Sequence, residues 1–143
     1  MTDKLQALYD DFDLLDEWED RYRYIIELGK NLPPFDDRFR DAAHKVSGCA
    51  SQVWIQSEPA ERDGRTVITY SGDSDALIVK GLIAIALRIF SGRTPEDILR
   101  QDAGAVFARL GLSEHLTQQR SNGLASMVKR IKSDALAAAQ AAE

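Results

Sequence analysis

The chain has 143 residues, of which 44% are hydrophobic, so its length and composition suit one domain whose core needs no disulfide. A formal net charge of -5 argues against nucleic acid as the main partner, because binding a phosphate backbone draws on concentrated Lys and Arg. The longest apolar run, 76–90, is shorter than the roughly 20 residues that span a bilayer, and we expect a buried helix there. The first residues lack the basic and apolar regions of a secretory signal, so the sequence predicts a cytoplasmic protein without a membrane span.

The first third of the chain predicts two helices. A short one is expected around 5–12, and a second begins after Asp16 as N-cap and ends at Gly29 and the proline pair 33–34. The acids between 10 and 20 lie mostly away from the apolar positions of these helices. Two interpretations stay open for them, a solvated helix face and a docking surface for a partner.

The middle of the chain changes to the two-residue period of strands. Apolar and polar residues alternate from Val53 to Gln56, Asp63 and Gly64 supply turn chemistry, and 65–70 is rich in β-branched residues. These features predict a β-hairpin. A further short strand at 45–47 would make it a small antiparallel sheet.

Helical spacing returns after the segment 72–75. Apolar residues then cover most of one helix, which we expect to be the central core helix with Gly92 at its end. Those residues are Leu77, Ile78, Leu82, Ile85, Leu87 and Ile89. Thr94 as N-cap and Pro95 as first helical residue predict another helix.

The last part of the chain predicts three helical segments. They are 96–100, then 105–110 with Gly111 as C-cap, and an amphipathic helix from Arg120 that precedes a fraying Ala-rich tail. No repeat or linker divides the chain, so residues 1–143 are expected to form a single compact domain. The order of elements predicts an α+β fold, a small antiparallel sheet covered by helices.

Cys49, the chain's only cysteine, lies on the loop between the strand candidates and cannot close an internal disulfide. A lone cysteine is often a small buried hydrophobe. Two features favour a mobile, reactive thiol instead: Gly48 gives the backbone freedom, and the residues that follow, through Gln52, are small or polar.

Five segments in order resemble the SufE-type sulfur acceptors of cysteine desulfurases, whose close relatives are the CsdE-type acceptors. The segments are 24–29 with 32–33, 46–54, 72–76, 79–82 and 120–124, and the resemblance extends from about Trp18 to Lys132. It implies a SufE/NifU-like fold. Ala50 departs from the family, which often has a larger polar residue after the cysteine.

The resemblance implies a sulfur carrier and desulfurase activator, not an enzyme. Cys49 would accept a persulfide sulfur from a SufS-type desulfurase and pass it to iron-sulfur cluster assembly and its scaffold proteins. The pyridoxal phosphate would belong to the desulfurase, and no cofactor would be bound stably. Whether the free protein is a monomer or a homodimer stays open.

The resemblance also assigns supporting residues around Cys49. Arg120 is the candidate cation that raises the thiolate fraction, with an ordinary surface arginine as the alternative. Asp75 would hold the cysteine loop at rest by hydrogen bonds, or it simply caps the core helix. Gly48, Ser51 and Gln52 would shape the loop. The thiol would rest over an apolar cavity until the partner draws the loop out.

Functions of other classes compete with sulfur transfer. An iron-sulfur scaffold is disfavoured, because one cysteine cannot supply the usual thiolate ligands. A thiol peroxidase or cysteine hydrolase needs a base beside the thiol, and His44 and His115, the only histidines, show no known signature. His44 and Lys45 could still tune the thiol. A CsdE-type acceptor for another desulfurase and a binding module with an inert cysteine remain as alternatives.

Overall fold

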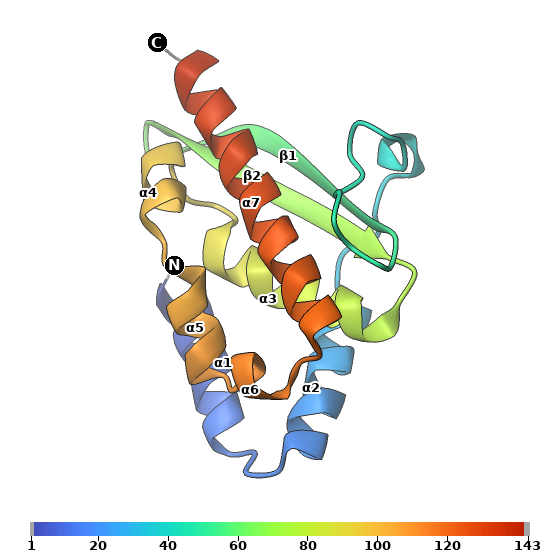
Figure 1. Cartoon of the computed structure of the whole chain (residues 1–143). Helices are drawn as coiled ribbons and strands as arrows, with labels where there is room; N and C mark the ends of the chain where they lie inside the picture. The colour runs from blue at the N-terminus through green and yellow to red at the C-terminus, as the bar shows by residue number, and fades with distance from the viewer. Residues whose placement is uncertain (1, 142–143) are drawn as a thin grey trace.

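A long β-hairpin is the only sheet in residues 2–141, the part of the chain that this computed structural model describes (Figure 1). Strand β1 is Val53–Arg62 and strand β2 is Arg65–Ser74. They pair antiparallel along their whole lengths, from Val53 opposite Ser74 to Arg62 opposite Arg65. Asp63 and Gly64 make the turn with positive φ angles of 53° and 76°, as two-residue hairpin turns require. The predicted hairpin and its turn are therefore confirmed.

The core helix α3, Leu77–Phe90, packs between the hairpin and the other helices. Most of its residues are buried, which confirms the predicted central helix. Helix α1 is Thr2–Asp13 and helix α2 is Trp18–Lys30, and α2 lies against α3. The two backbones touch, because a Cβ added at Gly81 would lie 2.1 Å from the carbonyl oxygen of Ile25.

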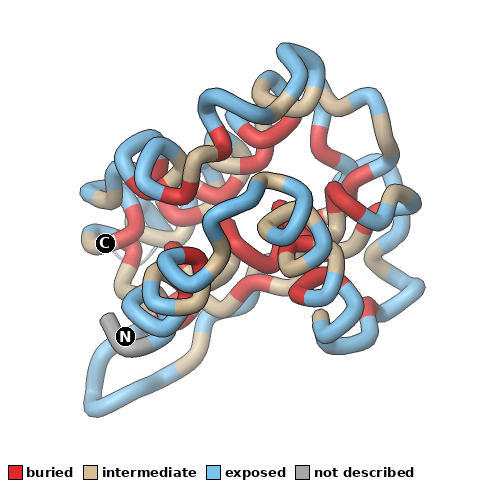
Figure 2. Tube along the Cα trace, turned by 90° about the horizontal axis from the view of Figure 1, so that it is seen from below, coloured by how far each residue is buried: buried red, intermediate tan, exposed pale blue. Residues whose placement is uncertain are grey.

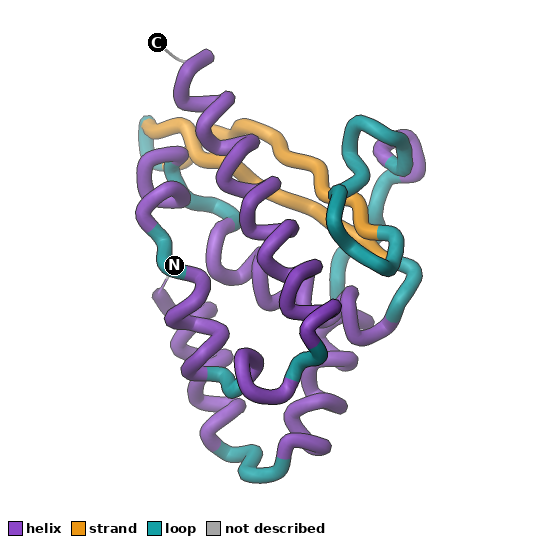
Figure 3. The backbone as a smooth tube through the Cα atoms, in the orientation of Figure 1, coloured by secondary structure: helices purple, strands orange, loops and turns teal. Residues whose placement is uncertain are grey.

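The C-terminal half of the chain covers the remaining core. Its helices are α4 (Pro95–Arg100), α5 (Ala103–Arg109), α6 (Leu112–His115) and α7 (Gln118–Ala141). The side chain of Thr94 accepts a hydrogen bond from the Asp97 amide, so the predicted cap is confirmed. Helix α7 runs across the face of the hairpin, with α3 behind it (Figures 1 and 3). This arrangement is the α+β fold that the sequence predicts.

Three local predictions are wrong. Asp16 does not cap α2: the N-cap is Glu17, and no side chain bonds there. The segment 45–47 is not a strand but a single bridge between Lys45 and Trp54, because the chain turns away at Gly48, whose φ is +90°. The Ala-rich tail remains helical to Ala141, and the reason is packing as well as the high helix propensity of alanine. Ala135 in this tail is fully buried.

Two short elements were not predicted at all. One is the 3-10 helix η1 at Asp37–Phe39, where the Asp36 side chain accepts from the Arg38 amide. The other is α6, a single turn that begins after Gly111 with φ +80°. Figure 2 shows the buried residues gathered along the interior segments of the trace, with exposed residues around them. None of the helices within residues 2–141 is both long enough and apolar enough to cross a membrane.

Candidate functional site

The Cys49 loop, residues 47–52, is tied at both ends to the hairpin. At its start the Val46 amide donates to the carbonyl oxygen of Val53 over 2.8 Å. At its end Gln52 lies opposite Asp75. These two residues directly adjoin Val53 and Ser74, the strand pair at the open end of the hairpin. The loop is therefore short, and both of its ends are hydrogen-bonded at the same end of the hairpin.

Asp75 holds the end of this loop with its side chain. The Gln52 amide donates to the Asp75 Oδ1 over 3.0 Å, and the Asp75 amide donates to the Gln52 carbonyl oxygen over 3.4 Å. Helix α3 has Ala76 as N-cap and no side-chain cap bond. The alternative of a plain helix cap is therefore wrong, because the carboxylate is bonded to the loop instead.

The thiol of Cys49 points onto helix α7. It is half-buried, packs at the edge of the hydrophobic core, and its Sγ donates to the carbonyl oxygen of Gly123 over 3.5 Å. Burial raises the pKa of the Cys49 thiol above its ordinary value. A carbonyl oxygen accepts from a thiol but cannot stabilise a thiolate, so this position of the loop keeps the sulfur protonated and weakly nucleophilic.

The loop lies directly against α7 at Gly48. A Cβ added there would lie 2.5 Å from the Ser126 Oγ, and the φ of +90° is itself unfavourable for other residues. Ser51 is half-buried, whereas Ala50 and Gln52 are exposed. Gly48 thus packs closely against α7, and Gln52 at the other end of the loop bonds to Asp75.

Arg120 lies on the same helix as the thiol's acceptor but does not contact the thiol. It precedes Gly123 by three residues, a spacing that places both on one face of α7. Within residues 2–141 its guanidinium makes no hydrogen bond or ion pair. His44 pairs with Asp41 over 2.7 Å, and this contact lowers the pKa of the Asp41 carboxyl. Asp75 is thus bonded to the Cys49 loop at Gln52, whereas Arg120 lies on the helix that accepts the thiol's hydrogen bond.

Two arginines that the sequence did not single out hold the chain in front of the loop. Arg130 on α7 donates from Nη2 to the carbonyl oxygen of Ala43 over 2.9 Å. Arg40 pairs with Asp73 over 2.7 Å and lies over the ring of Trp54. Their partners are distant in sequence, so no local pattern could reveal these contacts.

Asp73, the partner of Arg40, is partly buried. Burial alone would raise its pKa, but hydrogen bonds from Arg40 and the Ser74 amide, with the nearby charge of Lys80, lower it overall. Asp73 therefore stays ionised and pairs with both cations at neutral pH. The segment before the Cys49 loop is thus held by Arg40 and Arg130, whereas the loop itself is held by a few weak hydrogen bonds.

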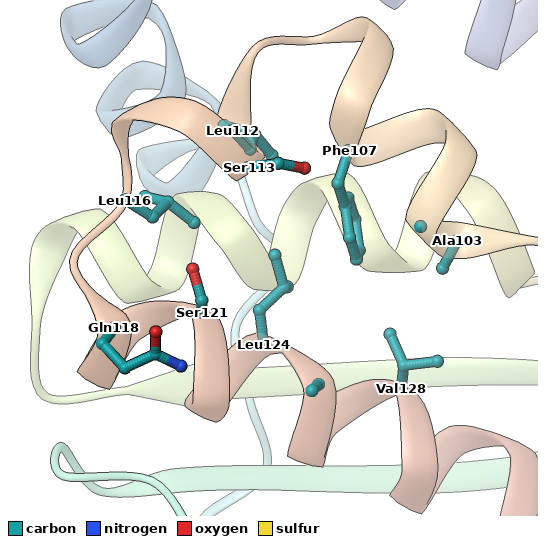
Figure 4. A pocket seen from close by; sticks show the side chains of 11 residues that line it. Ala103, Phe107, Leu112, Ser113, Leu116, Gln118, Ser121, Leu124 and Val128 are labelled. Carbon is teal, nitrogen blue, oxygen red and sulfur yellow. The ribbon is translucent and has the colours of Figure 1, made fainter.

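Two hollows lie along α7. One of about 370 Å³ borders the Cys49 loop, between Gly48 and the α7 side chains of Ser126 and Arg130. The other, of about 500 Å³, lies among α5, α6 and α7, with Phe107, Leu116 and Val128 around it (Figure 4). Cys49 lines neither. Across residues 2–141 no group of three His, Cys, Asp or Glu side chains is placed to hold a metal ion.

Proteins of other organisms are similar to this chain over most of its length. Two uncharacterised SufE-like proteins are similar over 131 residues each, one of Rhizobium meliloti at 53% identity and one of Rhizobium etli at 50%. Each alignment covers 92% of this chain, with 94% and 88% of the respective relatives. The solution structure of a hypothetical protein from Thermus thermophilus has a TM-score of 0.74 at 21% identity, covers 96% of both chains, and shares the fold.

The family comparison covers most of the chain. Residues 6–135 match the model described as SufE, Fe-S metabolism associated domain. This match includes the Cys49 loop, Asp75 and Arg120. The chain therefore belongs to the SufE family of Fe-S metabolism associated domains.

Proposed function

We propose that this chain is a cytoplasmic sulfur carrier that accepts a persulfide sulfur on Cys49 from a SufS-type cysteine desulfurase. It stimulates that enzyme and delivers the sulfur to the scaffold proteins of iron-sulfur cluster assembly. The family supports a role as sulfur acceptor in Fe-S metabolism. The observation that carries the finer proposal is a free thiol on a short loop. Only a few weak hydrogen bonds hold that loop, among them the bond from the thiol to Gly123 and the bond from Gln52 to Asp75.

The transfer is a thiol exchange at sulfur. The Cys49 thiol loses its proton to a base at the partner's site or to water, and the thiolate attacks the terminal sulfur of the desulfurase persulfide. A sulfur–sulfur bond forms on Cys49 while the one on the desulfurase cysteine breaks, and that cysteine leaves as a thiolate. No external oxidant or reductant is consumed. The pyridoxal phosphate that generates the persulfide stays in the desulfurase.

Reaction requires the Cys49 loop to leave α7. At rest the sulfur is half-buried against the Gly123 carbonyl, where its raised pKa opposes ionisation. Direct contact with a partner's sulfur means breaking this weak S–H bond and the Gln52–Asp75 bonds. These few bonds amount to a few kcal/mol, which contacts with a partner can offset. Once the Cys49 loop has left its resting place on α7, Arg120 at the start of that helix is the cation available to the thiolate.

Mass spectrometry tests the proposal directly. The protein is incubated with L-cysteine and a pyridoxal-phosphate desulfurase, and its intact mass is measured without reductant. We expect a gain of one sulfur atom on the parent protein and none on Cys49→Ser, which keeps the size of the side chain but lacks the nucleophile. A sulfur gain on Cys49→Ser would refute Cys49 as acceptor.

A panel of desulfurases separates the remaining alternatives. Stimulation of a SufS-type enzyme over the desulfurase that serves a CsdE-type acceptor supports the proposed partner, whereas the reverse order identifies a CsdE-type acceptor. A chain that gains no sulfur from any of them, and whose thiol resists alkylation, would be a binding module with an inert cysteine.

A further inference from the structure

Four arginines converge on one hollow at the turn end of the hairpin, far from Cys49. The hollow has a volume of about 490 Å³, and Arg62, Arg65, Arg93 and Arg100 line it together with two acids, Asp63 and Asp97. This arginine hollow, named for these four residues, thus carries two more positive than negative side chains. The whole chain has a net charge of -5, so the local surplus runs against the overall charge.

The floor of the arginine hollow is rigid. The Gly92 amide donates to the Ile68 carbonyl oxygen over 2.8 Å, and the Ile68 amide donates to the Arg93 carbonyl oxygen over 2.9 Å. The Arg93 side chain is 10% exposed, and its Nε donates to the Ile89 carbonyl oxygen over 2.6 Å. Its guanidinium is therefore held in a fixed position under the hollow.

The positive charge of the arginine hollow is only partly compensated. Asp97 lies 2.8 Å from Arg93 but 3.8 Å from Arg100, whose side chain is largely exposed. Arg65 makes no side-chain hydrogen bond or ion pair within residues 2–141. Arg62 already has a partner on the protein, since its Nη1 donates to the carbonyl oxygen of Gly92 over 3.4 Å. The side chains of Arg65 and Arg100 are therefore the ones most available to an anion in the hollow.

We propose that the arginine hollow binds a compact phosphate-bearing small molecule. Guanidinium groups present paired N–H donors that match phosphate oxygens, and four of them line this hollow, from the strand ends beside the hairpin turn and from the two ends of α4. The hollow is lined mostly by polar residues, and all of them come from two short segments, 62–67 and 92–100. That shape fits a small multivalent anion better than an extended acidic peptide, which would need a continuous basic groove.

The site is separate from sulfur transfer. The Cys49 loop joins the hairpin at Val53, and the arginine hollow begins at Arg62, nine residues along the same strand. At about 3.3 Å per residue, the two ends are roughly 30 Å apart. Binding of the anion is therefore expected to leave sulfur uptake by Cys49 intact.

A titration with inorganic pyrophosphate, followed by NMR of the backbone amides at low ionic strength, tests the proposal. We expect saturable shifts at Gly92, Arg93 and Thr94, weakened as salt is added. The double variant Arg65→Gln with Arg100→Gln should weaken binding at least ten-fold. Both side chains are exposed and neither supports the core, so this variant should fold. The matched control, Arg23→Gln with Arg38→Gln, removes the same charge elsewhere and should change the affinity less than two-fold.

Three outcomes would overturn the proposal. Shifts scattered over surface cations without saturation would mean general attraction of anions. Equal weakening in the two double variants would mean that net charge, and not the hollow, governs binding. A short tetra-aspartate peptide that shifts the same amides and binds more tightly than pyrophosphate would identify an acidic protein segment as the ligand.

Discussion

The thiol of Cys49 is placed for protection at rest and not for reaction. Its hydrogen bond runs to a carbonyl oxygen, its pKa is raised by burial, and no cation contributes to that shift. A fixed activating group would instead lower the pKa of the thiol and contact it. Movement of the loop is therefore what makes this sulfur nucleophilic, and the residues that restrain the loop control its reactivity.

Asp75→Ala tests this control at the level of one side chain. Loss of the carboxylate removes the bond to the Gln52 amide, so the loop should leave α7 more often and expose the thiol. We expect Cys49 to react severalfold faster with iodoacetamide at neutral pH. The apparent pKa of the alkylation profile should fall toward the ordinary thiol value of about 8.5, because burial is what raises it.

The control for this experiment is Glu19→Ala, which removes an exposed acid from the first turn of α2. Its alkylation rate should equal that of the parent chain. An Asp75→Ala profile that overlays the parent profile at every pH would mean that the Gln52–Asp75 bond does not restrain the loop.

Sequence reasoning placed Cys49 on a loop, because the strand pattern stops before it and resumes after it. The contacts of that loop were harder to predict from the sequence. The bond between Asp75 and Gln52 was anticipated only through the resemblance, since the sequence alone also allowed a helix cap. Arg40 and Arg130 were missed, because their partners Asp73 and Ala43 are 33 and 87 residues away, and neither a long-range ion pair nor a long-range hydrogen bond leaves a local signature.

At the scale of elements, α2 and α3 pack with their backbones in contact. A Cβ added at Gly81 would lie 2.1 Å from the Ile25 carbonyl oxygen, and one added at Gly29 would lie 2.6 Å from the Gly81 amide nitrogen. Both neighbours are backbone atoms that cannot move without shifting a helix. These two glycines therefore set the distance between the helices and, through α3, the position of Asp75.

Gly81→Ala should consequently destabilise the fold. Forcing the helices apart costs roughly 1–3 kcal/mol, which exceeds the gain of up to about 1 kcal/mol from replacing glycine in a helix. Urea unfolding followed by circular dichroism measures the difference. Gly123→Ala is the matched control: its Cβ would meet the Cys49 Sγ at 3.6 Å, an ordinary contact, so its stability should be equal or higher. A Gly81→Ala protein as stable as the parent would show that α2 and α3 can separate freely.

The elements with strong periodicity could be predicted and the others could not. The hairpin and α3 follow from alternation and from an apolar run, both local properties of the chain. The segment 45–47 has strand character, but pairing ends there because the chain turns at Gly48. The Ala-rich tail lacks an obvious apolar face, and its helix is secured by the burial of Ala135, which only the tertiary structure reveals.

At the scale of the molecule, the proposed sulfur transfer leaves two surfaces as candidate docking sites for a desulfurase. One is the Cys49 loop with the first turns of α7. The other is the acidic connection between α1 and α2, where Leu14 is 82% exposed, at the end of these helices that points away from the hairpin (Figure 1). Sulfur transfer requires the two sulfurs to touch, so docking must be centred on the first site.

Hydrogen exchange on the complex with the desulfurase distinguishes the two sites. We expect the amides of the Cys49 loop and of the segment around Arg120 to change protection together, since the thiol bonds to Gly123, three residues after Arg120 on α7. Arg120→Ala should lower stimulation of the desulfurase severalfold while thermal stability changes little, because its guanidinium makes no bond within residues 2–141. Arg38→Ala, an exposed arginine on η1, should leave stimulation unchanged. Protection confined to residues 10–20, with loss of stimulation on Leu14→Ala, would instead place the partner on the acidic connection. The thiol would then have to travel to a second contact.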